Sequence, residues 1–159
     1  MKTITETEAL QRVASYCSAA ERCRTEVFEK LQKWSIPPAG IERILFYLER
    51  EGYLDEERYC RAFVKDKYRF DKWGRRKIAQ ALHLKKISSA CVNRGLQEID
   101  QHEYRRGLCK LLEAKRRTIH AGDDYQRNAK LVRFALGRGF EMSDIRACLP
   151  GLVEELYPD

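Results

Sequence analysis

Apolar residues recur along the chain at the three- and four-residue spacing of amphipathic helices. Near the N-terminus they occupy Leu10, Val13, Ala14 and Cys17, which is the i, i+3, i+4, i+7 pattern of one helix face. No segment of useful length alternates apolar and polar residues as a half-buried strand does. The pattern therefore predicts an all-α fold.

The same apolar pattern occurs three times. A shift of 51 positions places Val27 on Ile78, and a further shift of 53 places Ile78 on Leu131. The other apolar matches at these two shifts are Leu31 with Leu82, Ile36 with Ile87, Ile41 with Val92, Leu45 with Leu96, Ile87 with Phe140, and Val92 with Ile145. Periods near 50 residues are typical of stacked helical modules. We expect an elongated array of three tandem three-helix, helix-turn-helix-like repeats, spanning 1–52, 53–100 and 101–159.

Residues that cap or stop helices predict the helix boundaries within each repeat. We expect second helices at 21–34, 74–85 and 124–138, and third helices at 38–51, 89–99 and 143–153. Pro38 suits the first turn of a helix, and Ser88 and Ser143 are candidate N-caps for the same helix in the other repeats. Asp55 is a candidate N-cap for the helix that follows it, and Gly52 marks a helix end.

Positive charge is concentrated in two bands. The whole chain has a formal net charge of +7, but residues 61–86 alone hold ten basic and two acidic residues, and residues 105–117 sum to +5. Banded basic charge with a pI of about 9.1 favours a polyanionic partner, either nucleic acid or an acidic protein surface. The alternative is a solvated helix face without a partner.

Motifs for catalysis or metal binding are absent from the sequence. His83, His102 and His120 show no metal-ligand spacing, and Gly137-Arg138-Gly139 is too short for a phosphate-binding loop. We therefore expect neither enzymatic activity nor a cofactor.

The cysteines and the apolar runs indicate the compartment. The six cysteines, Cys17, Cys23, Cys60, Cys91, Cys109 and Cys148, form no CxxC pair. They are expected to be small core residues in a reducing environment, and not metal ligands or disulfide partners. No run of 18 uncharged apolar residues occurs, and the N-terminal sequence lacks the apolar core of a signal peptide. A cytoplasmic protein with no membrane partner is expected.

The middle of the chain holds the most specific motifs of the sequence. They are GYLDEERYCRAFV at 52–64, WGRRKI at 73–78, Leu82, and KKI at 85–87. With these motifs the chain resembles the RecX regulatory family. Two departures are Tyr59-Cys60, where the family usually has Phe-Ala, and Lys86, where it usually has Gly, a residue that stops a helix easily. The resemblance covers nearly the whole chain, because that family is also built of tandem three-helix repeats.

The resemblance implies a small, non-enzymatic regulator that acts in DNA repair, homologous recombination and the SOS response. Such a protein binds the RecA recombinase filament on DNA, lies along its groove, and limits its ATPase, filament extension and strand exchange. Contact with DNA is expected to be weak, directed at phosphates and sensitive to salt. We expect a monomer.

Basic residues of the two bands are the candidate contacts with RecA or DNA. They are Arg61, Lys65, Lys67, Arg69, Lys72, Arg75, Arg76, Lys77, Lys85, Lys86, Arg116 and Arg117. Cations at a helix N-terminus are disfavoured by about 0.3–1 kcal/mol each, so Arg75, Arg76 and Lys77 suggest a role other than helix stability. For Arg116 and Arg117 the alternative is a favourable interaction with the end of a helix. Trp73 is expected to anchor two helices and not to stack on a base.

Two other functions are compatible with the sequence. One is a sequence-specific DNA-binding regulator of the helix-turn-helix type, which would read a groove from one helix and span two half-sites as a dimer. The third helix of the middle repeat offers few groove-reading residues beyond Asn93, Arg94 and Gln97. The other is a purely structural helical adaptor, which would show no salt-dependent binding to DNA.

Overall fold

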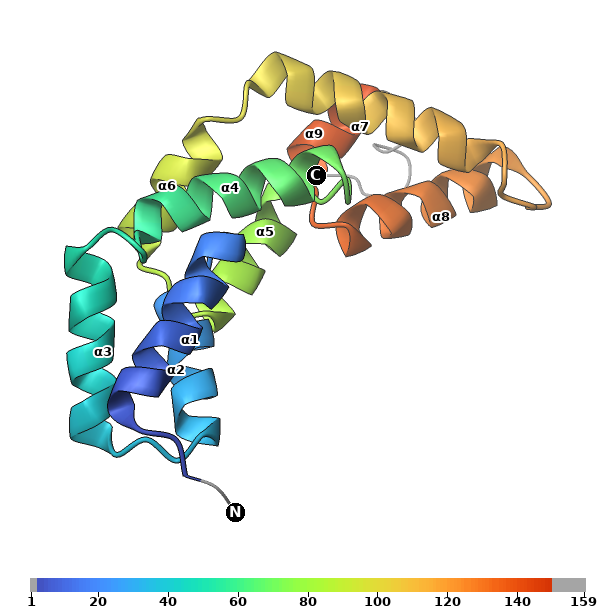
Figure 1. Cartoon of the computed structure of the whole chain (residues 1–159). Coiled ribbons are helices and arrows are strands. Elements are labelled where there is room, and N and C mark those ends of the chain that lie inside the picture. Colours follow the sequence, from blue (N-terminus) through green and yellow to red (C-terminus); the bar gives the residue numbers. More distant parts are fainter. Residues whose placement is uncertain (1–2, 150–159) are drawn as a thin grey trace. The chain divides into compact units, whose positions relative to one another are not determined.

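A computed structural model of the chain describes residues 3–149. Within them lie nine α-helices and no strand (Figure 1). The helices are α1 (Glu6–Ala19), α2 (Arg24–Lys33), α3 (Pro38–Arg50), α4 (Glu56–Arg69), α5 (Arg75–Leu84), α6 (Ser89–Gln97), α7 (Gln101–Arg116), α8 (Asp124–Gly137) and α9 (Met142–Cys148). Taken in threes along the chain, they confirm the predicted all-α fold of tandem three-helix repeats.

The chain divides into two compact units. Unit 1 comprises Met1–Phe63 and Leu82–Val92, and unit 2 comprises Val64–Ala81 and Asn93–Asp159. Each of α4, α5 and α6 therefore contributes residues to both units. The repeat boundaries at 52 and 100 remain a prediction from the sequence period.

Each unit has its own hydrophobic core. In unit 1, α1, α2 and α3 pack together and bury residues such as Val13, Leu31 and Leu45. In unit 2, α8 and α9 pack against α7, and the core includes Tyr104, which is fully buried, and Phe140. Of these residues, Leu31, Leu45 and Phe140 are positions that carry the sequence repeat, so the shared pattern is a pattern of buried residues.

The second helix of every repeat ends in the same turn. Ser35, Lys86 and Gly139 follow α2, α5 and α8 with φ angles of 61°, 63° and 95°. The amides of the next residues, Ile36, Ile87 and Phe140, donate hydrogen bonds to the carbonyls of Leu31, Leu82 and Ala135 at 3.1, 3.2 and 3.1 Å. This is the Schellman pattern, in which a residue in the left-handed region ends a helix. The three turns are separated by the same 51 and 53 positions as the apolar matches.

Replacing Lys86 with Gly should stabilise the protein. A non-glycine residue in the left-handed region costs about 1–2 kcal/mol, so Lys86→Gly should raise the free energy of unfolding by about 1 kcal/mol relative to Lys86→Ala. The Ala variant is the matched control, since it removes the same charge and keeps a Cβ atom. Urea denaturation of both variants measures the difference, and equal midpoints would contradict the strain assigned to this turn.

Most of the predicted caps are confirmed. Pro38 is the first residue of α3, and Asp55 Oδ1 accepts a hydrogen bond from the amide of Arg58 at 3.0 Å. The Ser88 hydroxyl accepts from the amide of Cys91 at 3.3 Å, at the start of α6. Ser143 is not an N-cap: α9 begins at Met142, after Glu141 in extended conformation. The predicted continuation of this helix to 153 lies outside the described residues.

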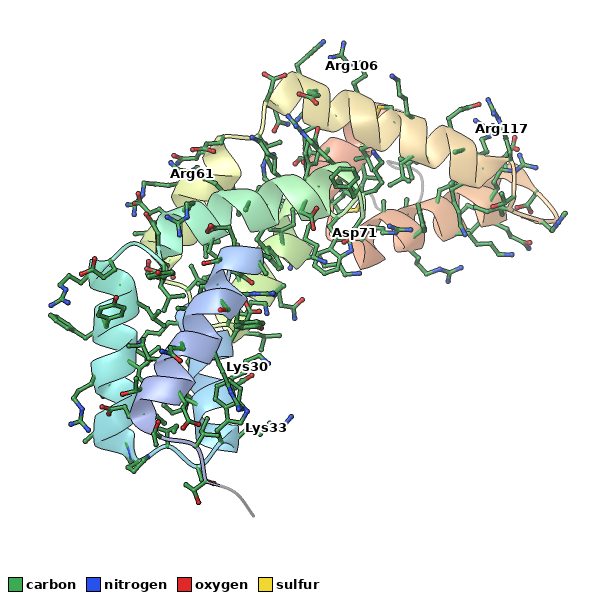
Figure 2. The ribbon with its side chains drawn as sticks, viewed as in Figure 1. Lys30, Lys33, Arg61, Asp71, Arg106 and Arg117 are labelled. Carbon is green, nitrogen blue, oxygen red and sulfur yellow. A yellow bond between two sulfur atoms is a disulfide. The ribbon has the colours of Figure 1, made fainter. Side chains whose placement is uncertain are left out.

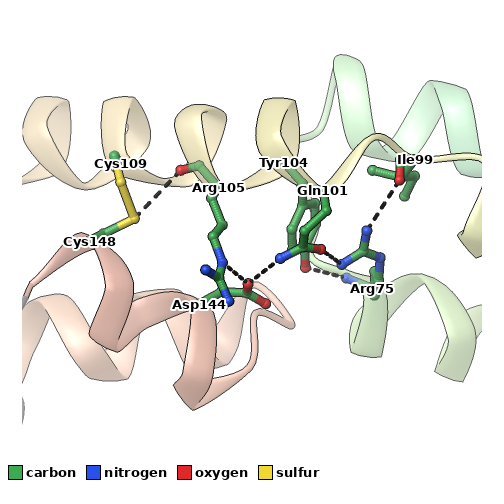
Figure 3. A network of polar contacts seen from close by, with 8 residues as sticks. All are labelled: Arg75, Ile99, Gln101, Tyr104, Arg105, Cys109, Asp144 and Cys148. Carbon is green, nitrogen blue, oxygen red and sulfur yellow. Dashed lines mark hydrogen bonds and ion pairs between the residues drawn. A yellow bond between two sulfur atoms is a disulfide. The ribbon is translucent and has the colours of Figure 1, made fainter.

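The prediction that all six cysteines are free thiols is wrong for one pair. Cys109 on α7 and Cys148 on α9 form a disulfide, with Cα atoms 5.2 Å apart and a sequence separation of 39 (Figure 3). Sequence spacing gives no sign of this pair, because it arises from the packing of two helices. The other four cysteines are buried thiols, as expected of small core residues.

Candidate functional site

Nine of the twelve predicted contact residues lie in one compact unit. Arg61, Lys85 and Lys86 belong to unit 1, and the remainder belong to unit 2. In unit 2 the exposed residues are Lys65, Arg69, Lys72, Arg76, Arg116 and Arg117, while Lys67, Arg75 and Lys77 are partly buried. Arg116 ends α7 and Arg117 is its C-cap, where a cation interacts favourably with the last carbonyls. Unit 2 is therefore the part of the chain in which a shared basic site can be described.

Arg75 is held by contacts within unit 2. Its Nη1 atom donates a hydrogen bond to Gln101 Oε1 at 2.6 Å, and its Nη2 atom donates to the carbonyl of Ile99 at 3.3 Å (Figure 3). Its backbone amide donates to the hydroxyl of Tyr104 at 2.9 Å, and its guanidinium lies 4.1 Å from the centre of that ring. These contacts offset the unfavourable position of a cation at the start of α5. They favour a structural role for Arg75.

The same network continues to α9 through Asp144. One oxygen of this buried carboxylate, Oδ1, accepts hydrogen bonds from Gln101 Nε2 and from Arg105 Nε, both at 2.8 Å (Figure 3). Burial raises the pKa of the neighbouring Tyr104 to about 12, so that hydroxyl stays protonated at neutral pH. A buried charge with two cationic or polar donors fixes the geometry of the groups around it. The starts of α5 and α7 are thereby joined to α9.

Trp73 makes cation–π contacts with two of the candidate lysines. The ammonium groups of Lys67 and Lys77 lie 4.9 and 4.6 Å from the centre of its ring. Lys67 also forms an ion pair with Asp71 at 3.0 Å. Because two cations already lie over the indole, these contacts support the prediction that Trp73 anchors local structure.

A close contact of two glycines joins the start of α5 to the end of α8. The amide of Gly74 donates to the carbonyl of Arg138 at 2.7 Å, and the amide of Arg76 donates to the carbonyl of Gly139 at 3.0 Å. A Cβ atom on Gly74 would lie only 2.4 Å from the backbone of Gly139. The contact thus depends on the absence of a side chain at Gly74.

A groove with a basic rim runs between the end of α4 and α7. Its volume is about 760 Å³, and we call it the basic groove. Its apolar floor consists of Tyr68, Tyr104, Gly107, Leu108, Leu111, Ala114 and Phe140. Its charged rim consists of Arg69, Lys72, Glu103, Arg106 and Lys110. Four cations against one carboxylate make it a candidate site for an anionic partner.

The sequence prediction includes two of the four rim cations. Arg69 and Lys72 were candidates, whereas Arg106 and Lys110 belong to the second basic band and were not selected. Arg106 lies near the start of α7 (Figure 2), one turn before Lys110, so both project from one side of that helix. The spacing of four is a signal for a shared helix face, but it does not reveal which helix end lies opposite.

A second cavity, in unit 1, has balanced charge. It has a volume of about 700 Å³, and its charged lining residues are Arg22, Arg24, Lys85, Lys86, Glu42, Glu49, Asp55 and Glu56. Arg24 forms ion pairs with Glu42 at 3.1 Å and with Glu49. Because its cations face an equal number of carboxylates, this cavity is less suited to a polyanion than the basic groove.

Residues 3–149 contain neither a metal-ligand cluster nor a membrane-spanning helix. No cluster of three His, Cys, Asp or Glu side chains there is arranged to hold a metal ion. None of the described helices has the length and apolar character needed to cross a membrane.

Comparisons with known proteins agree on one family. The models of the second and third three-helix domains of RecX match residues 55–96 and 103–149, together more than half of the chain. The regulatory protein RecX of Chlorobium phaeobacteroides strain BS1 is 28% identical over 129 residues, which are 81% of this chain and 83% of the relative. That of Prosthecochloris aestuarii strain DSM 271 / SK 413 is 27% identical over 146 residues, 92% of this chain and 94% of the relative.

A solved structure shows the same fold. The crystal structure of RecX from Lactobacillus salivarius superposes with a TM-score of 0.80 at 20% identity, covering 93% of this chain and 96% of that one. The family models fall on the repeats that build unit 2 and its basic groove. The chain therefore belongs to the RecX family of regulatory proteins.

Proposed function

We propose that this protein binds the RecA filament on DNA and limits its ATPase, its extension and its strand exchange. The observation that carries the proposal is the basic groove of unit 2, four cations around an apolar floor, in a chain of the RecX family. The protein acts by occupying the filament and performs no chemistry of its own. It works in the cytoplasm as a monomer.

The physical fit is between banded positive charge and a surface rich in negative charge. A RecA filament on DNA presents phosphates and acidic protein groups together, and exposed cations such as Arg69, Arg76 and Arg106 suit either. Contacts from successive repeats add through effective concentration, because the repeats are linked in one chain. Modest contacts at each repeat are then sufficient for tight binding.

Inhibition of RecA by this protein should be lost when the groove charges are reversed. We expect ATP hydrolysis by RecA on single-stranded DNA to fall when the protein is added well below the RecA concentration. Arg106→Glu/Lys110→Glu should need about tenfold more protein for the same inhibition, since each reversed charge weakens binding by ~0.7 kcal/mol.

The matched control is Lys33→Glu/Arg133→Glu, which changes the net charge equally at two exposed cations away from the groove. It should inhibit like the unaltered protein. Equal loss in both variants would mean that only net charge matters. No inhibition by the unaltered protein, with tight and sequence-selective binding to duplex DNA as a dimer, would instead identify a helix-turn-helix regulator.

A further inference from the structure

The exposed floor of the basic groove is largely aliphatic. Tyr104 and Phe140 are buried, at 0% and 3% exposure, so little of either ring is available for stacking. Tyr68 is partly exposed, and the accessible floor beside it is formed by Leu111 and Ala114. Single strands of nucleic acid are held by successive exposed aromatic faces. An aliphatic floor is better filled by an apolar amino-acid side chain.

Gly107 keeps the groove open. It lies inside the 16-residue helix α7, where Gly is destabilising relative to Ala. The fold does not require Gly there, because the nearest atom to an added Cβ would be the Tyr68 hydroxyl oxygen at 4.0 Å. Gly107 is unfavourable for the helix, and packing within the chain does not require it. A partner that occupies the groove beside Gly107 explains why a side chain is absent there.

The rim is available to carboxylates. Arg69 and Lys72 come from the end of α4 and the residues after it, and Arg106 and Lys110 come from one side of α7. Among residues 3–149 none of these four forms an ion pair, although the Lys72 ammonium donates to the carbonyl of Arg69 at 2.7 Å. An apolar centre surrounded by charge is typical of a protein interface, where one anchor residue fills a pocket and polar groups surround it.

We propose that the basic groove binds a short acidic segment of a partner protein. One apolar side chain of the segment lies on the floor, and its carboxylates contact the rim cations on the two sides of the groove. The inference rests on the proposed function in one respect: it assigns this contact to the protein part of the filament and not to its DNA. Phosphates would meet the rim cations equally well, but they would leave the aliphatic floor empty.

The test uses a fluorescent peptide with a single Phe flanked by three acidic residues on each side. Fluorescence polarisation of the peptide measures its binding to the protein. The unaltered protein should bind it, and binding should fall at least tenfold when Phe is replaced by Ser or when the acids are replaced by Gln and Asn. Gly107→Leu should also weaken binding at least tenfold, because it fills the floor without changing the rim charge. Circular dichroism checks that this variant is folded.

Arg106→Glu/Lys110→Glu should weaken peptide binding to a similar extent, and Lys33→Glu/Arg133→Glu should leave it unchanged. Peptide binding that is unaffected by Gly107→Leu and by the rim reversal would overturn the inference. So would binding of an oligothymidylate that is lost in the same variants while the peptide does not bind, since the groove would then hold nucleic acid.

The RecA assay separates this inference from the proposed function. If the protein inhibits RecA but binds no peptide, the inference fails and the function stands. If it binds the peptide but does not inhibit RecA, the inference that the groove binds an acidic segment stands and the proposed function fails.

Discussion

Replacing Gly74 with Ala should lower the free energy of unfolding by about 2–3 kcal/mol. The added Cβ would lie 2.4 Å from the backbone carbon of Gly139 and from the amide nitrogen of Phe140. Backbone cannot swing aside as a flexible side chain can, so the two turns must move apart. That movement also weakens the hydrogen bonds from Gly74 to Arg138 and from Arg76 to Gly139. Urea denaturation followed by circular dichroism measures the change.

Gly137→Ala is the matched control for this experiment. Gly137 is the last residue of α8, and an added Cβ would have no neighbour within 4 Å. Ala is a better helix former than Gly by up to about 1 kcal/mol, so this variant should be as stable as the unaltered protein or slightly more so. If Gly74→Ala behaved in the same way, the close contact between these two turns would be disproved.

Reduction of the Cys109–Cys148 disulfide should lower the free energy of unfolding by about 2–4 kcal/mol. The bond links residues 39 apart, and closing a loop of that length restricts the unfolded chain substantially. Urea denaturation with and without dithiothreitol measures the difference. A thiol titration of the denatured protein should count four thiols before reduction and six afterwards.

The variant Cys109→Ser/Cys148→Ser serves as the control. It should resemble the reduced protein in stability, and dithiothreitol should have no further effect on it. Six thiols in protein purified without a reductant would contradict the disulfide. A stability that does not depend on the reductant would show instead that the bond adds nothing to the packing of α7 against α9.

Features that depend on nearby residues could be predicted from sequence. Helices follow from apolar spacing, and the threefold repeat follows from comparing the chain with itself. The caps at Pro38, Ser88 and Asp55 depend on residues within one turn, so local chemistry identified them. The prediction that Ser143 caps α9 is wrong because Glu141, two residues earlier, has the extended backbone that precedes the helix. A favourable residue type does not decide between adjacent positions.

Features that depend on distant residues could not be predicted. The rim of the basic groove combines residues about 40 positions apart, and the disulfide joins residues from two helices with another helix between them. Arg75 is instructive, because its unfavourable position at a helix start suggested a contact with RecA or DNA. Gln101 and Ile99 supply partners for it inside the chain, and no local rule names them.

The attachment of α7 has a consequence for the kinetics of recognition. This helix is fixed by the Asp144 network and by the buried ring of Tyr104, neither of which depends on the oxidation state of the Cys109–Cys148 pair. A groove wall that is already in place loses little conformational freedom when a ligand arrives. Ordering is then confined to the incoming segment, and charge steering by the rim sets the association rate. Changes in salt should therefore alter how fast the groove is filled more than how long it stays filled.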